Sequence, residues 1–138
     1  MDKNLKFLDI TEIKKRLIRF YFSYGGYFGG ISTINIFKKD NLIECIYEHD
    51  QEEICLKYNI SIEKWEEFIE KIFLENVHKW NTSYDNNNID DGIQWELRLD
   101  FTDLPNFESY GSNKYPYNWN NFKSILYSFI PQILHDHF

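Results

Sequence analysis

The sequence predicts one α+β domain over residues 1–138, with an antiparallel β-sheet of about five to six strands and two main helices packed on one face. Residues 93–101 (IQWELRLDF) alternate between apolar and polar without exception, which is typical of a half-buried strand. Residues 62–78 repeat apolar side chains at helical spacing. Short turns separate the apolar stretches of the first half, and such turns join antiparallel strands. Helices covering one face of an antiparallel sheet satisfy all three observations.

The first half is expected to form a short helix followed by three or four strands. Thr11 can cap the helix over residues 12–17, which places Ile13 and Leu17 on one side. The stretches with strand-like content are 18–24, 31–37, 42–48 and 54–58. The glycine-rich residues 25–30 (GGYFGG) predict a tight reversal between the first two stretches, because glycine tolerates positive φ angles.

The middle helix is expected from residue 62 to about residue 78. Ser61 can cap its N-terminus, and Glu63 in the first turn suits the positive end of the helix dipole. Its apolar stripe comprises Ile62, Trp65, Phe68, Ile69, Ile72 and Phe73, with Asn76 at the same spacing. Trp80 closes the helix, and the polar residues 81–91 predict a loop.

A hairpin and a last helix are expected to complete the fold. Residues 107–111 (FESYG) form the hairpin partner of the strand over 93–101. The last helix begins after Pro116, with Asn118 as its cap, and ends or kinks at Pro131. Its predicted buried stripe consists of Trp119, Phe122, Ile125, Leu126 and Phe129.

Charge and hydropathy exclude two classes of partner. The chain has 22 acidic and 15 basic residues and a net charge of −7, so we expect no direct binding to nucleic acid. No apolar run approaches the roughly 18 residues of a membrane span, and acidic residues interrupt the N-terminus, so we expect a cytoplasmic protein. Cys45 and Cys55 lie near neighbouring predicted strands, and in that compartment we expect two free thiols rather than a bridge.

The sequence contains none of the common catalytic or metal-binding patterns, so we expect no enzyme, no metal site and no cofactor. It lacks a G-x-S-x-G elbow, an H-E-x-x-H motif, a C-x-x-C pair and EF-hand spacing. The spacing of Cys45 and His49 is more often accidental than catalytic. The acids Asp90 and Asp91 are explained by turn chemistry. The His135–Asp136–His137 stretch lies at a terminus, where metal binding would be adventitious.

Two kinds of surface are candidates for binding. Acidic residues project from the outer side of the middle helix and cluster before it, where they would complement a basic partner protein. Aromatic and asparagine side chains in two predicted loops could contact a partner or a ligand. The predicted binding residues are Glu63, Glu66, Glu67, Glu70, Asn113, Tyr115, Tyr117 and Tyr27, and the acidic cluster comprises Glu44, Glu48, Asp50, Glu52 and Glu53. The alternative is a solvated helix face and a structural joint at residues 110–119 (YGSNKYPYNW).

Residues 91–122 resemble a family of small uncharacterised proteins of low-GC bacteria and their mobile elements. The shared pattern is D-G-x-x-W-x-L followed by G-x-N-x-Y-P-x-N-W, and residues 21–30 also resemble the N-terminal part of that family. The resemblance covers about a third of the chain and implies an α+β fold. It implies no specific activity, although such proteins often accompany toxin or mobile-element genes.

These observations favour a non-enzymatic acidic binding protein that inhibits or masks a partner protein. An immunity protein, or a phage or mobile-element inhibitor of host defence, fits this description, and a homodimer is left open. The alternative is a sponge for a small molecule or nucleotide, stacked between Tyr115 and Trp119 and hydrogen-bonded by asparagine side chains.

Overall fold

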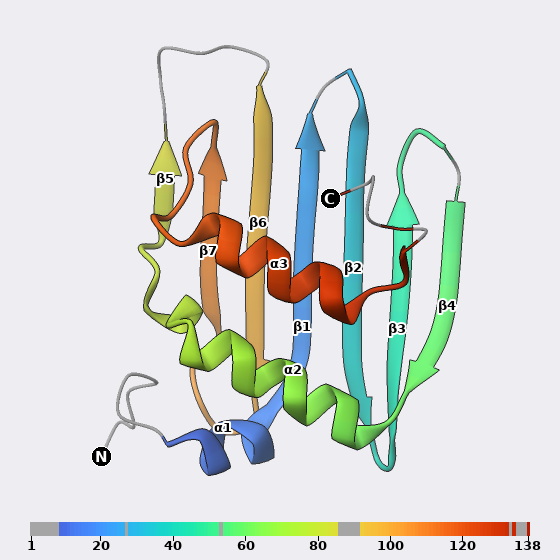
Figure 1. The fold of residues 1–138 in the computed structure, drawn as a ribbon, viewed down its shortest axis with the longest axis vertical. Helices are drawn as coiled ribbons and strands as arrows, with labels where there is room; N and C mark the ends of the chain where they lie inside the picture. Colours follow the sequence, from blue (N-terminus) through green and yellow to red (C-terminus); the bar gives the residue numbers. More distant parts are fainter. Residues whose placement is uncertain (1–8, 27, 53, 86–91, 133, 135–137) are drawn as a thin grey trace.

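The computed structural model describes residues 9–26, 28–52, 54–85, 92–132, 134 and 138. These residues form an α+β fold in which helices α2 and α3 cross one face of a seven-stranded sheet (Figure 1). The elements are α1 (Ile10–Arg16), β1 (Leu17–Gly26), β2 (Gly30–Lys39), β3 (Leu42–His49), β4 (Ile54–Ile60), α2 (Ile62–Leu74), the 3₁₀ helix η2 (Val77–Lys79), β5 (Ser83–Asp85), β6 (Ile93–Phe101), β7 (Phe107–Ser112) and α3 (Trp119–Phe129). The predicted fold class and the two main helices are confirmed.

The strands lie in the order β4-β3-β2-β1-β6-β7-β5, so the first four strands form a meander and β6 pairs with the free side of β1. The prediction of a purely antiparallel sheet is wrong in one detail, because β5 pairs parallel with β7. This strand lies in the segment 81–91, which was predicted to be a loop. Its three residues are too few for an alternating pattern, and they pair with the available edge of β7. The hydrogen bond from Tyr110 N–H to Thr82 O, just before the strand, extends this pairing. Residues 86–91 lie outside the described part of the chain.

The first helix begins two residues earlier than predicted. Asp9, not Thr11, accepts the capping hydrogen bond, from the main-chain N–H of Glu12 at 2.9 Å. An aspartate at this position also places a negative charge at the positive end of the helix dipole. The helix runs directly into β1 at Leu17, because that residue already has an extended conformation.

Helix α2 begins as predicted and ends earlier than predicted. The Ser61 side chain accepts a hydrogen bond from Lys64 N–H at 3.1 Å, which confirms the predicted N-cap. The helix stops at Leu74 because Asn76 adopts a left-handed conformation with φ 61°. Asparagine tolerates this conformation better than most residues. Asn76 is exposed rather than part of the buried stripe.

Asn118 occupies the predicted position before α3, but its side chain makes no capping hydrogen bond. Its Oδ1 accepts the indole N–H of Trp80 at 2.8 Å, and its Nδ2 donates to the main-chain oxygen of Glu75 at 2.7 Å. The side chain therefore turns away from its own helix and joins the end of α2 to the start of α3. With only 4% of its surface exposed, Asn118 is a buried polar connection.

The segment from Gly111 to Asn113 is shaped by close contacts with β6. A Cβ at Gly111 would lie 2.2 Å from Nε1 of Trp95, so glycine is required where the indole crosses β7. That indole donates to the main-chain oxygen of Lys114 at 3.0 Å. Asn113 has φ 55°, and its Oδ1 accepts from Ile93 N–H at 2.8 Å. Asn113 therefore holds the loop against β6 through a main-chain N–H.

The core lies between the sheet and the two long helices. Leu97 and Leu99 of β6 are fully buried, as the alternation predicts. The ring of Phe68 from α2 contacts Phe20 of β1 at 5.0 Å and Phe129 of α3 at 4.0 Å between centroids, so it joins all three elements. The alternate residues of the same strands point to the opposite face of the sheet, which α2 and α3 leave uncovered (Figure 1). We call this the open face.

His78 in η2 makes the stability depend on pH. It is 8% exposed, its ring packs on Phe73 at 4.4 Å, and no described residue bonds its Nδ1. Burial lowers the pKa of His78 to about 4. The unfolded chain, with an ordinary histidine pKa of about 6.5, therefore binds the proton first, and stability falls as the pH drops from 6.5 to 4.

We expect this histidine to cost the protein about 2–3 kcal/mol of unfolding free energy between pH 7 and pH 4. His78→Phe keeps the ring contact with Phe73 and removes the titrating group. Between pH 7 and pH 4, the free energy of unfolding in urea should therefore decrease by about 2–3 kcal/mol less for this variant than for the wild type. If the free energy of unfolding depends on pH in the same way in both proteins, His78 is not the cause of the decrease.

Candidate functional site

The four predicted glutamates of α2 form a mixed surface rather than a purely acidic one. Glu63 and Glu67 are exposed, while Glu66 and Glu70 are half-buried. Two of them are paired with lysines: Glu70 lies 3.1 Å from Lys14 Nζ, and Glu67 lies 3.2 Å from Lys71 Nζ. Exposed pairs of this kind contribute little to stability, but they reduce the net charge that this side offers to a partner.

Tyr115 and Tyr117 lie near the start of α3, at the opposite end of α2 from Glu63. Tyr117 is 90% exposed, and Tyr115 is 36% exposed and rests on Trp119 with 4.9 Å between ring centroids. Burial raises the pKa of Tyr115. Glu63 is about 17 Å along the helix axis from the end of α2 that meets the start of α3. Tyr27 and Glu53 lie outside the described residues.

The cysteines and histidines in the described part of the chain do not assemble into a reactive site. Cys45 and His49 lie four residues apart on one strand, which separates them by about 13 Å. Cys45 is buried, and burial raises the pKa of its thiol to about 12. Cys55 is exposed, and because Cys45 is opposite Tyr58 in the sheet register, the two thiols point to opposite faces. Both are free, as predicted.

Among the described residues, no group of three or more His, Cys, Asp or Glu side chains is arranged to hold a metal ion. The acids Asp90 and Asp91 and the histidines His135 and His137 lie outside that part of the chain. The arrangement that remains for binding is a hollowed surface on the open face of the sheet.

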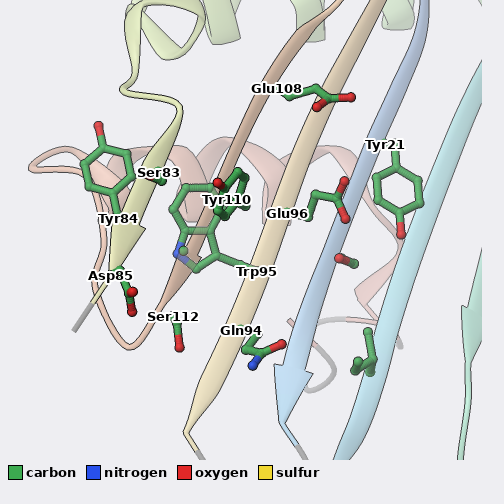
Figure 2. Close-up of a pocket in the computed structure, with 13 residues that line it drawn as sticks. Tyr21, Ser83, Tyr84, Asp85, Gln94, Trp95, Glu96, Glu108, Tyr110 and Ser112 are labelled. Carbon is green, nitrogen blue, oxygen red and sulfur yellow. The ribbon is translucent and has the colours of Figure 1, made fainter. Parts of the chain in front are cut away.

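A groove of about 820 Å³ runs across the open face over β1, β6, β7 and β5 (Figure 2). The register places Ser23, Glu96, Tyr110 and Ser83 opposite one another on these four strands. The small side chains of Ser23 and Ser83 leave space between larger neighbours. Ser23 is 9% exposed, whereas Tyr110 is 51% exposed.

Two smaller hollows adjoin this groove, and both share Ile31 with it. One, of about 400 Å³, is lined by residues that include Gly25, Gln94 and Asp50. The other, of about 430 Å³, reaches the edge strand β4 at Cys55 and also includes Glu48. Together the three hollows cover the end of the open face where β1 and β2 are joined.

The open face is acidic where it is hollowed. The described residues that line the three hollows include five carboxylates and neither a lysine nor an arginine; the acids are Glu48, Asp50, Asp85, Glu96 and Glu108. Arg98 lies next to the groove and pairs with Glu108 at 3.2 Å. The face can therefore attract a cation by charge and bind it through carboxylate, hydroxyl and amide oxygens.

Sequence reasoning found part of this surface. The predicted acidic cluster included Glu48 and Asp50, which line the hollows. The sequence reasoning missed Glu96 and Tyr110, because alternating polar residues are expected on the solvated face of any strand. The available signal was the concentration of small and acidic residues on one face of several predicted strands.

Comparisons with protein-family models, with curated proteins and with solved structures give no match. The described helices include none that is long and apolar enough to cross a membrane. The site therefore has to be interpreted from its own geometry and charge.

Proposed function

We propose that the protein is a non-enzymatic binding protein that masks a basic partner protein with its open face. The observation that supports this proposal most directly is the charge of the three hollows, in which five carboxylates face outward without a lining lysine or arginine among the described residues. Tyr21 and Tyr110 add aromatic area, which interfaces favour because a tyrosine loses little entropy on binding.

A sheet face is a suitable scaffold for this role. Four of the five carboxylates lie on hydrogen-bonded strands, so their backbone is already ordered and only the side chains have to be fixed on binding. The net charge of −7 attracts a basic partner at a distance, and the hollowed face then determines its orientation. Masking by such a surface requires no chemistry, which suits an immunity protein or a phage or mobile-element inhibitor of host defence.

A small-molecule sponge is the second candidate, and the groove volume favours it. A volume of about 820 Å³ falls within the range of ligand pockets. A ligand between Tyr115 and Trp119 is not supported, because those rings already contact each other and leave no gap. A small ligand of this protein would instead be a cation bound on the open face.

Removing three of the carboxylates of the open face should weaken partner binding. We expect the triple variant Glu48→Gln, Asp85→Asn and Glu96→Gln to bind its partner at least tenfold more weakly than the wild type. The loss follows from removing three of the five lining carboxylates. The partner is first captured on the tagged wild-type protein and identified by mass spectrometry, and its affinity is then measured with purified proteins at two salt concentrations.

The matched control removes the same charge from α2 through Glu63→Gln, Glu66→Gln and Glu67→Gln. This variant should bind within about threefold of the wild type. If the two variants exchange these results, the glutamates of α2 are the binding surface and the open face is not. If neither variant weakens binding, the acidic-docking proposal fails.

A further inference from the structure

We infer that the groove on the open face contains a subsite for an arginine side chain of the partner, with Glu96 as the carboxylate that binds the guanidinium. This inference rests on the proposed function and names the chemical group that the face recognises. Ser23 is placed at the floor of the subsite, and Tyr21 and Tyr110 at its sides.

The sheet register brings these residues together. Ser23 of β1 is opposite Glu96 of β6, and Glu96 is opposite Tyr110 of β7. Tyr21 lies two residues before Ser23 on the same face of β1, and Figure 2 shows Glu96 between Tyr110 and Tyr21. The two strands that carry the tyrosines are two steps apart in the sheet, or about 10 Å, which leaves room for a planar cation between the rings.

The Ser23 hydroxyl is an independent indication of a ligand. The residue is 9% exposed and lines the groove, and no described residue makes a hydrogen bond with its side chain. The residue is nine-tenths buried, but its oxygen is not among the fully buried unpaired atoms, so the hydroxyl opens into the groove. Because a hydroxyl oxygen accepts hydrogen bonds, a guanidinium N–H entering from the groove would satisfy it.

Glu96 is available to bind a cation. Among the described residues it has no salt bridge, although its neighbours on β6 do. Arg98, two residues along the strand, is directed to Glu108. Asp100, two residues further, pairs with Arg19 at 3.4 Å. The carboxylate of Glu96 therefore differs from the other charged groups of β6, because it faces the groove without a described counter-ion.

The protein already binds a guanidinium of its own on the same face with the same kinds of group. Arg19 packs on the rings of Tyr21 and Phe37, at 5.5 and 5.2 Å from their centroids. Its Nε donates to Asn35 Oδ1 at 3.0 Å, and its Nη1 donates to Asp100 at 3.4 Å. Two rings, a neutral oxygen and a carboxylate thus surround one arginine of the chain.

The groove repeats that set of groups. Tyr21 and Tyr110 provide rings, Ser23 provides a neutral oxygen, and Glu96 provides the carboxylate. An arginine fits this set better than a lysine, because its planar guanidinium stacks on aromatic rings and donates hydrogen bonds in several directions. Gln94, also in the lining, offers a further amide oxygen.

The test is an NMR titration of the ¹⁵N-labelled protein with N-acetyl-arginine amide as the probe. We expect shifts at Ser23, Glu96 and Tyr110, with a dissociation constant in the millimolar range for an isolated side chain. The lysine analogue should bind at least threefold more weakly. The citrulline analogue, which has the same shape without the charge, should give no saturable shift at these residues.

Two variants and a matched control complete the test. Glu96→Gln should weaken arginine binding at least tenfold, and Ser23→Ala about threefold, whereas Glu66→Gln on α2 should leave it unchanged. Each variant is first shown to keep the amide spectrum of the folded protein. Equal binding by Glu96→Gln and the wild type, or equal shifts with citrulline, would overturn the subsite.

The outcome for the subsite is separable from that for the proposed function. If the triple open-face variant loses its partner but the arginine probe gives no shift, the face binds a protein and the arginine subsite is wrong. If the probe binds at Glu96 while arginine-to-citrulline or arginine-to-alanine replacement in the captured partner leaves its affinity unchanged, the inference is overturned and a small guanidino compound is the occupant.

Discussion

Trp119→Ala is expected to lower the free energy of unfolding by about 3 kcal/mol, the low end of the cost for a large core aromatic, because Trp119 is half-buried against the core rather than fully inside it. The Trp119 ring is the centre of a cluster that joins the sheet to α3. Its centroid lies 4.8 Å from that of Trp95, 5.6 Å from Phe122 and 6.0 Å from Trp80. Truncation would remove the contacts that α3 makes with β6 and with the end of η2.

Urea unfolding followed by circular dichroism measures this loss. Tyr117→Ala is the control, because Tyr117 is two residues away and 90% exposed, so its free energy of unfolding should change by less than about 0.5 kcal/mol. A stable Trp119→Ala protein that no longer binds its partner would give the segment 110–119 a direct role in binding. The geometry indicates instead a structural joint that presents Tyr117 at the surface.

Asn118→Leu is expected to cost about 3 kcal/mol, although leucine has a similar size and is more apolar. The substitution leaves the indole N–H of Trp80 and the main-chain oxygen of Glu75 without their hydrogen bonds to this side chain. Each buried polar group left unpaired costs about 1–3 kcal/mol. The same unfolding measurement tests the prediction.

Asn121→Leu is the matched control on the same helix. Asn121 donates to Glu75 Oε1 at 2.8 Å, but it is exposed, so water can replace the lost hydrogen bond. We expect this change to cost less than about 1 kcal/mol. Equal losses for the two variants would mean that the burial of Asn118 is not what makes its hydrogen bonds important.

Local patterns were sufficient to predict most of the fold. Residues 93–101 alternate strictly, and they form β6 with the predicted bounds. Ser61 and the helical repeat that follows it correctly placed the start of α2. In both cases the signal lies in neighbouring residues, because the period of the side chains and the chemistry of a cap are local properties.

The errors arose where distant residues determine the structure. Residues Ser83–Asp85 become a strand because β7 offers an edge to pair with, and no pattern in three residues can reveal that. Asn118 was expected to cap its own helix, but its hydrogen-bond partners Glu75 and Trp80 lie about 40 residues earlier in the chain. A rule based on the next few residues cannot weigh such partners.

The candidate site was harder to predict than the fold for the same reason. Ser23, Glu96 and Tyr110 belong to three strands, and only the register places them in one row. Their residue types are ordinary for the solvated side of a strand. The overall acidity of the chain was visible in the sequence, whereas the location of the hollowed acidic surface depended on the order of strands.

The contrast between the two cysteines has a practical consequence for labelling. Burial raises the pKa of Cys45 to about 12 and shields it, so maleimide reagents will react with Cys55 in the folded protein. Cys55 lines the hollow at the β4 edge of the open face. A fluorophore or spin label attached there would stand at the β4 edge of the proposed docking surface without an engineered cysteine. The native chain thus provides a labelling site from which the binding of a partner can be detected by spectroscopy.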